Sequence, residues 1–218
     1  MNELEKERLQ KIIDYTSNGK NVLDFPEEFS KKLFASGWTM IPTLPIYTAN
    51  TIFNAEDKDV DFLIRVFLKE EKPFNSMIDN IMKSSIDEAL KEVVNEALYA
   101  YNSGRYRVCG IALLAVIEGG LSQFLEDKRT TNIRNLCESE SNKYKNEKSL
   151  KSVFWISCND FIQVLYNHSN FNDNEPEGLN RHWLLHGRSK YDVNEVDCMK
   201  LFNAISCICL LISQYLDK

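Results

Sequence analysis

The chain has 218 residues, of which 44% are hydrophobic and 27% charged, a balance typical of soluble globular proteins and not of disordered or fibrous ones. The formal net charge of −6 argues against a protein that binds polyanions indiscriminately over its whole surface. The excess of acid is N-terminal, because residues 1–100 carry 18 acids and 12 bases whereas residues 101–218 carry 14 of each. The acidic N-terminal region is therefore expected to be a poor platform for RNA.

The N-terminal region, residues 1–85, is expected to be a helical extension whose role the sequence does not assign. Its first residues alternate acids and bases, so they lack the features of a secretion or transit signal, and a cytoplasmic location is expected. Helices are predicted over residues 3–16, 24–37, 59–68 and 76–84. Asp24 is the expected N-cap of the second helix and Gly37 its stop, and the Pro42–Pro45 segment that follows is expected to be a buried connector.

The second half is predicted to consist of packed helices. Residues 90–101 show the spacing of an amphipathic helix, residues 105–126 are apolar on most faces and so should be central, and residues 150–167 form another helix. The last helix is expected to begin at Asp192 and run to residue 216. Its second half is apolar nearly all round, so it is either threaded through the core or covered by another subunit. Its longest apolar run, residues 204–212, is shorter than the roughly 20 residues of a membrane span, and no membrane association is expected.

Two further features leave alternatives open. Residues 128–151 hold seven bases and three acids, so this segment either contacts phosphates or is a solvated linker between helices. None of the six cysteines forms a CxxC pair, and they are expected to be reduced packing residues.

The stretch NRHWLLHG, residues 180–187, brings together an arginine and two of the three histidines. Its helix is predicted to begin either at Asn174 as N-cap or nearer Asn180, and to stop at Gly187. His182 and His186 have the i, i+4 spacing of metal ligands, but Trp183 stands where the HExxH pattern needs glutamate, and no third ligand is evident. No metal or cofactor is therefore predicted. A polar edge of a core helix and a nucleic-acid site remain as alternatives.

The arrangement R-H-x-x-x-H formed by Arg181, His182 and His186 resembles the Rx4-6H signature of the HEPN superfamily. EALYAYNSGRYRVCGIALLAVIEGGLSQFL is similar to the first two helices of such domains, with Glu118 deep in the second helix. LNRHWLLHGRSKYDVNEVDCMKLFNAI is similar to the motif and last helix of a branch found in bacterial and phage-defence proteins. The resemblance covers roughly residues 86–218, which are predicted to form a HEPN-like helical domain.

This resemblance implies an all-α, antiparallel helical bundle that is frequently a homodimer, with the two motifs facing each other across the interface. The apolar stretch after Met199 predicts that this interface is formed by the C-terminal helices, around residues 181–186 and 196–216. Many members are metal-independent endoribonucleases that act as toxins or defence effectors, with RNA as substrate and an antitoxin or regulatory protein as partner; others are catalytically inactive modules that bind RNA, nucleotide or protein. RNA carries its own nucleophile, the 2′-hydroxyl, so histidine can transfer protons while arginine binds the phosphate. Arg181 and His186 are the predicted catalytic residues.

Three other residues are predicted to support the site. Asn180 and His182 would orient the phosphate or the arginine, and Glu118 either pairs with Arg181 or lies on an exposed stripe. On a regular helix, residues five apart are rotated by about 140°, so Arg181 and His186 should not share one narrow face. The sequence therefore predicts that one subunit's arginine meets the partner's histidine in a shared cleft.

Overall fold

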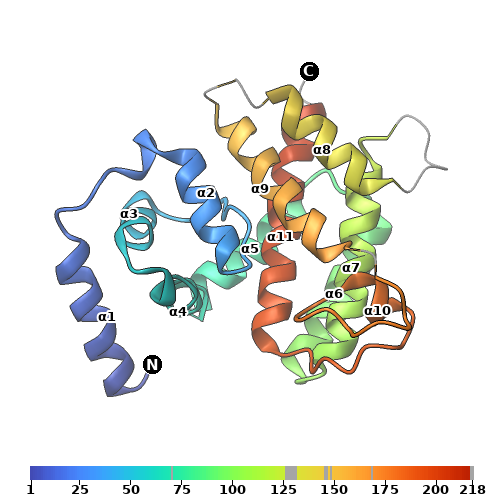
Figure 1. Ribbon diagram of the computed structural model, residues 1–218, viewed down its shortest axis with the longest axis horizontal. Coiled ribbons are helices and arrows are strands. Elements are labelled where there is room, and N and C mark those ends of the chain that lie inside the picture. The colour runs from blue at the N-terminus through green and yellow to red at the C-terminus, as the bar shows by residue number, and fades with distance from the viewer. Residues whose placement is uncertain (70, 126–131, 145–146, 148, 168, 217–218) are drawn as a thin grey trace.

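The computed structural model describes residues 1–69, 71–125, 132–144, 147, 149–167 and 169–216. All regular structure in these ranges is helical, which confirms the predicted all-α class. Figure 1 shows a smaller N-terminal group of helices beside a larger bundle that is built around α11. The HEPN-like character expected of residues 86–218 stays a prediction.

The N-terminal group packs around one hydrophobic cluster that includes the fully buried Leu33, Trp38, Ile52 and Ile64. Its elements are α1 (Glu3–Thr16), the short 3₁₀ helix η1 (Val22–Asp24), α2 (Pro26–Ala35), α3 (Ile46–Asn54) and α4 (Asp57–Lys69).

Two local predictions in this group need correction. Asp24 lies in η1 and does not cap α2, whose N-cap residue is Phe25 and makes no side-chain capping bond. The expected buried connector is only half-buried at Pro42 and Leu44 and is exposed at Pro45. It ends at Pro45, the N-cap residue of α3, because proline's fixed φ suits the entry to a helix. Gly37 does end α2 as predicted, with a φ of +78° that glycine adopts without strain.

The larger bundle has seven helices within the described ranges: α5 (Glu71–Lys83), α6 (Glu88–Asn102), α7 (Tyr106–Ser122), α8 (Ile133–Tyr144), α9 (Leu150–Leu165), α10 (Arg181–Leu185) and α11 (Glu195–Leu216). α11 lies against α5, α7 and α9, and α6 pairs with α7. Gly119 permits the close approach of α6 and α7, because a Cβ atom there would lie 2.7 Å from a methyl carbon of Leu90.

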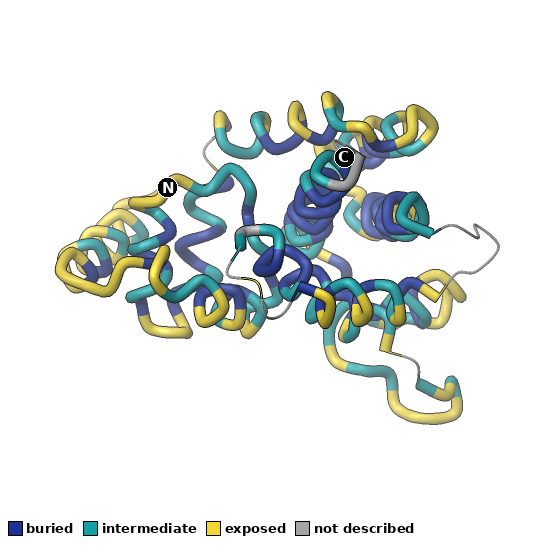
Figure 2. Tube along the Cα trace, turned by 90° about the horizontal axis from the view of Figure 1, so that it is seen from above, coloured by how far each residue is buried: buried dark blue, intermediate teal, exposed yellow. Residues whose placement is uncertain are grey.

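The composition of α11 left two alternatives, a helix threaded through the core or a helix covered by another subunit. Its side chains from Leu201 to Cys209 are buried within this one chain, and in Figure 2 the helix leading to the C-terminus is mainly dark blue. It is threaded through the core, so it offers a partner subunit little surface. Among the described residues α11 is the helix whose length and composition would suffice to cross a membrane, but 78% of that stretch is buried inside the fold, as for any central bundle helix.

The start of α11 also differs from the prediction. Its N-terminal cap is Asn194, not Asp192: the Asn194 side chain accepts the backbone N–H of Asp197 at 3.3 Å, and the Asp197 carboxylate accepts the N–H of Asn194 at 2.9 Å. This reciprocal pair is a capping box shifted by two residues along the chain.

The basic segment is not a solvated linker over its described part. Residues 133–144 form α8, which packs on α9 through the buried Ile133, Cys137, Ser141 and Tyr144. Their spacing of four, four and three residues is that of one helical face, although only some of these residues are apolar. Several of the bases counted in this segment, including Lys128 and Arg129, lie outside the described residues. All six cysteines are buried and free, which confirms their prediction as reduced packing residues.

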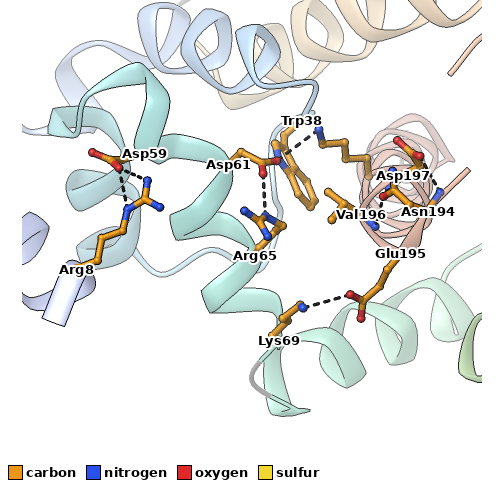
Figure 3. Close-up of polar contacts among 11 residues, drawn as sticks. Arg8, Trp38, Asp59, Asp61, Arg65, Lys69, Asn194, Glu195, Val196 and Asp197 are labelled. Atoms are coloured by element: carbon orange, nitrogen blue, oxygen red, sulfur yellow. Dashed lines mark hydrogen bonds and ion pairs between the residues drawn. The ribbon is translucent and has the colours of Figure 1, made fainter. Parts of the chain in front are cut away.

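Polar contacts join the N-terminal group to the bundle. Asp61 accepts hydrogen bonds from Trp38 Nε1 at 3.0 Å and Arg65 Nε at 2.7 Å, and its carboxylate lies 3.4 Å from Lys200 Nζ of α11 (Figure 3). Although burial alone would raise the pKa of Asp61, these donors and cations outweigh it and lower the pKa. Lys69 pairs with Glu195 at 3.2 Å.

The hydrophobic packing does not divide at residue 85. Met77, Ile78 and Ile81 of α5 belong to the hydrophobic cluster of the bundle, whereas Met199 of α11 belongs to the N-terminal cluster. The packing thus places α5 with the bundle, and a division of the chain into two domains stays a prediction.

Candidate functional site

The motif helix α10 is short and closed at both ends. Asn180, not Asn174, is its N-cap: the buried side chain accepts the backbone N–H of Trp183 at 3.2 Å and donates to the carbonyl of Asn167 at 2.8 Å. The helix ends at Leu185, and Gly187 follows with a φ of +67°, as predicted. The backbone N–H of Arg188 then donates to the carbonyl of Trp183 at 3.0 Å. Of the two predicted starts, the later one is therefore observed.

The apolar middle of the motif anchors it to the bundle. Trp183 and Leu184 are buried, and Trp183 Nε1 donates to Ser169 Oγ at 2.6 Å. α10 packs on α7, and both lie beside the loops before and after α10 in Figure 1. Because the two apolar side chains hold the helix down, Arg181, His182 and His186 remain at least partly accessible.

Arg181 forms an ion pair with Glu118 of α7. One terminal nitrogen of the guanidinium lies 2.6 Å from Glu118 Oε2, and the two side chains are 28% and 27% exposed. Of the two alternatives for Glu118, pairing with Arg181 is therefore the one observed. The carboxylate offsets the charge of the guanidinium, so this pair carries no net charge.

The pair has an aromatic neighbour, Tyr166. The guanidinium carbon of Arg181 lies 5.4 Å from the centre of the Tyr166 ring. Burial raises the pKa of the Tyr166 hydroxyl, and the negative charge of Glu118 raises it further. Within the described residues, the Tyr166 hydroxyl and Arg181 Nε are buried without a hydrogen-bond partner. Both groups therefore keep unused hydrogen-bonding capacity beside the ion pair.

The two histidines gather around a different aromatic ring. His182 stacks on Phe171 with ring centres 4.3 Å apart and planes within 7°, and His186 contacts the same ring edge-on at 5.4 Å. The two imidazole rings are 4.8 Å apart. The guanidinium carbon of the exposed Arg188 lies 4.4 Å from the centre of the Phe171 ring. We call Phe171, His182, His186 and Arg188 the Phe171 cluster.

The motif residues thus belong to two separate sets of contacts. Arg181 contacts Glu118 and Tyr166, whereas His182 and His186 contact Phe171 and each other. None of the contacts within the described part of the chain joins Arg181 to His186. His186 lies just beyond the end of α10, with φ and ψ of −85° and 4°, so the rotation expected for a regular helix does not extend to it.

A second carboxylate fixes the loop that carries Arg188. Glu175 accepts hydrogen bonds from Ser189 Oγ at 2.5 Å and from the backbone N–H of Lys190 at 2.8 Å. Burial by itself would raise the pKa of Glu175, but these hydrogen bonds together outweigh it, and the pKa is lowered. Arg107 of α7 donates to the carbonyl oxygens of Ser189 and Tyr191 at 3.3 and 2.5 Å. The loops on either side of α10 are therefore held together and to α7.

Sequence reasoning missed Phe171, Glu175 and Arg188. Arg188 lies two residues beyond His186, so its proximity was a readable signal. Phe171 and Glu175 stand in an irregular segment with no periodicity, and nothing local indicates that they meet α10 or its loop.

The described residues contain no group of three histidine, cysteine, aspartate or glutamate side chains arranged to hold a metal ion. His182 and His186 thus have no third ligand in this part of the chain. Comparison of the chain with protein-family models, curated proteins and solved structures gave no match.

Proposed function

We propose that the protein is a metal-independent endoribonuclease of the HEPN type, whose active site is the accessible surface of α10 and its flanking loops. The observation that carries this proposal is the gathering of Arg181, His182 and His186 on one short, firmly capped element, where the apolar residues between them are buried. Such a surface offers proton-transfer groups and phosphate donors together, which are the groups that RNA cleavage needs.

The chemistry follows from the substrate's own nucleophile. The 2′-oxygen attacks the adjacent phosphorus and loses its proton to a base, while the bond from phosphorus to the 5′-oxygen breaks and that oxygen takes up a proton. His186, which is exposed, is the proposed acid–base residue, and Arg181 donates N–H groups to a phosphate oxygen. Glu118 acts as a positioning residue that holds the guanidinium. The products are a 2′,3′-cyclic phosphate and a 5′-hydroxyl.

A homodimer belongs to the same proposal; its interface keeps the expected motif helix α10 but uses α7 in place of the buried α11. Val108 and Ile111 on α7 are 58% and 39% exposed, and Leu185 on the adjacent α10 is 36% exposed. These apolar side chains lie on α10 and on α7, the helix that also carries Glu118, so a second copy that covers them would bring two motifs near each other. A cytoplasmic toxin or phage-defence role, with an antitoxin or regulatory partner, is the biological setting we propose.

A catalytically inactive module that binds RNA, nucleotide or protein is the second candidate. The ion pair between Arg181 and Glu118 favours it, because a guanidinium already bound to a carboxylate is less available to a transition state.

One assay separates the two candidates. Purified protein is incubated with a mixed RNA pool, with and without EDTA, and the product ends are analysed. The nuclease proposal expects cleavage that EDTA does not inhibit and products ending in 2′,3′-cyclic phosphate. Binding of RNA without cleavage supports the inactive module, and products bearing only 3′-hydroxyl ends would exclude the proposed chemistry.

A further inference from the structure

The basic side chains around α10 are not equivalent as phosphate ligands. Arg181 is neutralised by Glu118 at 2.6 Å. Arg188 is exposed, and within the described residues it makes no ion pair with a carboxylate. A phosphodiester carries one negative charge, so of these two arginines Arg188 is the one whose positive charge is available to attract it.

The contact of Arg188 with Phe171 leaves its hydrogen-bonding edge available. A guanidinium that lies over an aromatic ring uses its flat face, whereas its N–H donors point outward in its own plane. The guanidinium carbon is 4.4 Å from the centre of the Phe171 ring, which also contacts His182 and His186. One phenyl ring thus holds a free guanidinium and two imidazoles at the same place.

The backbone around Arg188 is fixed before any ligand binds. Gly187 turns the chain at a φ of +67°, and the N–H of Arg188 is bonded to the carbonyl of Trp183. Glu175 binds the next residues of the loop through Ser189 and Lys190. Because the backbone of this loop is already ordered in the folded protein, binding a phosphate at Arg188 costs little additional conformational entropy.

We propose that Arg188 is the residue that binds the scissile phosphate of the RNA strand by charge and by its planar pair of N–H donors, beside the imidazoles of the Phe171 cluster. Arg181 then contributes hydrogen bonds from a guanidinium whose charge Glu118 offsets. This inference rests on the proposed function, since it names the phosphate-binding residue of that site.

The test uses a fluorescent single-stranded DNA, which lacks the 2′-hydroxyl and so cannot be cleaved by this chemistry. Its dissociation constant is measured by anisotropy over a range of salt concentrations for wild type, Arg188→Gln, Arg188→Lys and a matched control, Lys190→Gln, on the same loop. Arg188→Gln is expected to weaken binding at low salt by at least about tenfold and to reduce the salt slope by about 0.7, the loss of one phosphate contact. Arg188→Lys should restore the slope but only part of the affinity, because the charge returns without the fork of donors.

The outcomes separate this inference from the nuclease proposal. Lys190→Gln should change the dissociation constant less than Arg188→Gln does, and all variants should keep the melting temperature of the wild type. If wild type binds the strand through Arg188 but cuts no RNA, the nuclease proposal fails and Arg188 stands as the phosphate-binding residue of a binding module. If wild type does not bind the strand, or Arg188→Gln is no weaker than Lys190→Gln, the assignment of Arg188 is wrong, whether or not RNA is cleaved.

Discussion

The basic side chains on the two sides of α10 differ in their partners and in their exposure to solvent. Toward α7, Arg181 is half-buried and paired with Glu118, whereas beyond the end of the helix Arg188 and His186 remain exposed around Phe171. A five-residue helix thus holds one side chain in a structural ion pair and leaves others available to a ligand. The spacing of a motif identifies residues that lie near each other, but the tertiary partners decide which of them carries usable charge.

The largest expected effect is that of removing the exposed imidazole. His186→Ala should lower RNA cleavage by about 10²–10⁴-fold, the usual contribution of a general acid or base, because His186 is the accessible proton-transfer group of the Phe171 cluster. The fold should be unchanged, since an exposed side chain leaves no cavity. The measurement is the single-turnover cleavage rate with Lys190→Ala as control. Equal rates for wild type and His186→Ala would show that another residue carries out the proton transfer.

The next largest effect is expected at Trp183, the buried side chain that holds α10 on the bundle. Trp183→Ala should destabilise the protein by about 3–5 kcal/mol, because a buried indole and its bond to Ser169 are lost. Trp183→Phe retains the ring packing and should lose about 1 kcal/mol, the net value of the hydrogen bond. Urea unfolding followed by circular dichroism measures both. If the two variants are equally stable, α10 is not held by the packing of Trp183.

The ion pair on the α7 side should have a smaller effect on stability. Glu118→Ala leaves the half-buried Arg181 guanidinium without its partner and should cost about 1–2 kcal/mol, whereas the double variant with Arg181→Ala should cost less than the sum. A coupling of about 1 kcal/mol is expected for a pair that is partly screened by solvent. A coupling near zero in the double-mutant cycle would show that the pair does not position Arg181.

The smallest effect is a pH-dependent loosening of the loop that carries Arg188. The folded-state pKa of Glu175 lies below its ordinary value of 4.5, so its hydrogen bonds to Ser189 and Lys190 are fully formed above that pH and are lost as the pH falls through the lowered pKa. The amide signals of Lys190 and Tyr191 in NMR spectra should shift in this acid range. Glu175→Gln should abolish the titration, while Glu177→Gln should leave it intact; a titration that survives Glu175→Gln assigns it to another group.

The sequence by itself determined the features that depend on neighbouring residues. The all-α class, the stop at Gly187, the helix over residues 3–16 and the burial of the cysteines all follow from periodicity, capping chemistry and composition. The same local signals placed Asn180 and Asn174 as competing N-caps. They could not choose between the two, because a cap is selected by what its side chain meets, and Asn180 meets the distant carbonyl of Asn167.

Only the tertiary structure decided how the site is assembled. The pairing of Glu118 with Arg181 and the meeting of Phe171 with His182, His186 and Arg188 join segments that no periodic pattern relates. α8 was missed because its buried face includes the polar Ser141, which composition alone does not mark as core. The position of α11 in the core became clear only from α5, α7 and α9, the helices that pack against it. The physical reason is common to all: the energy of a charge or an apolar face depends on the groups packed against it, and those come from elsewhere in the chain.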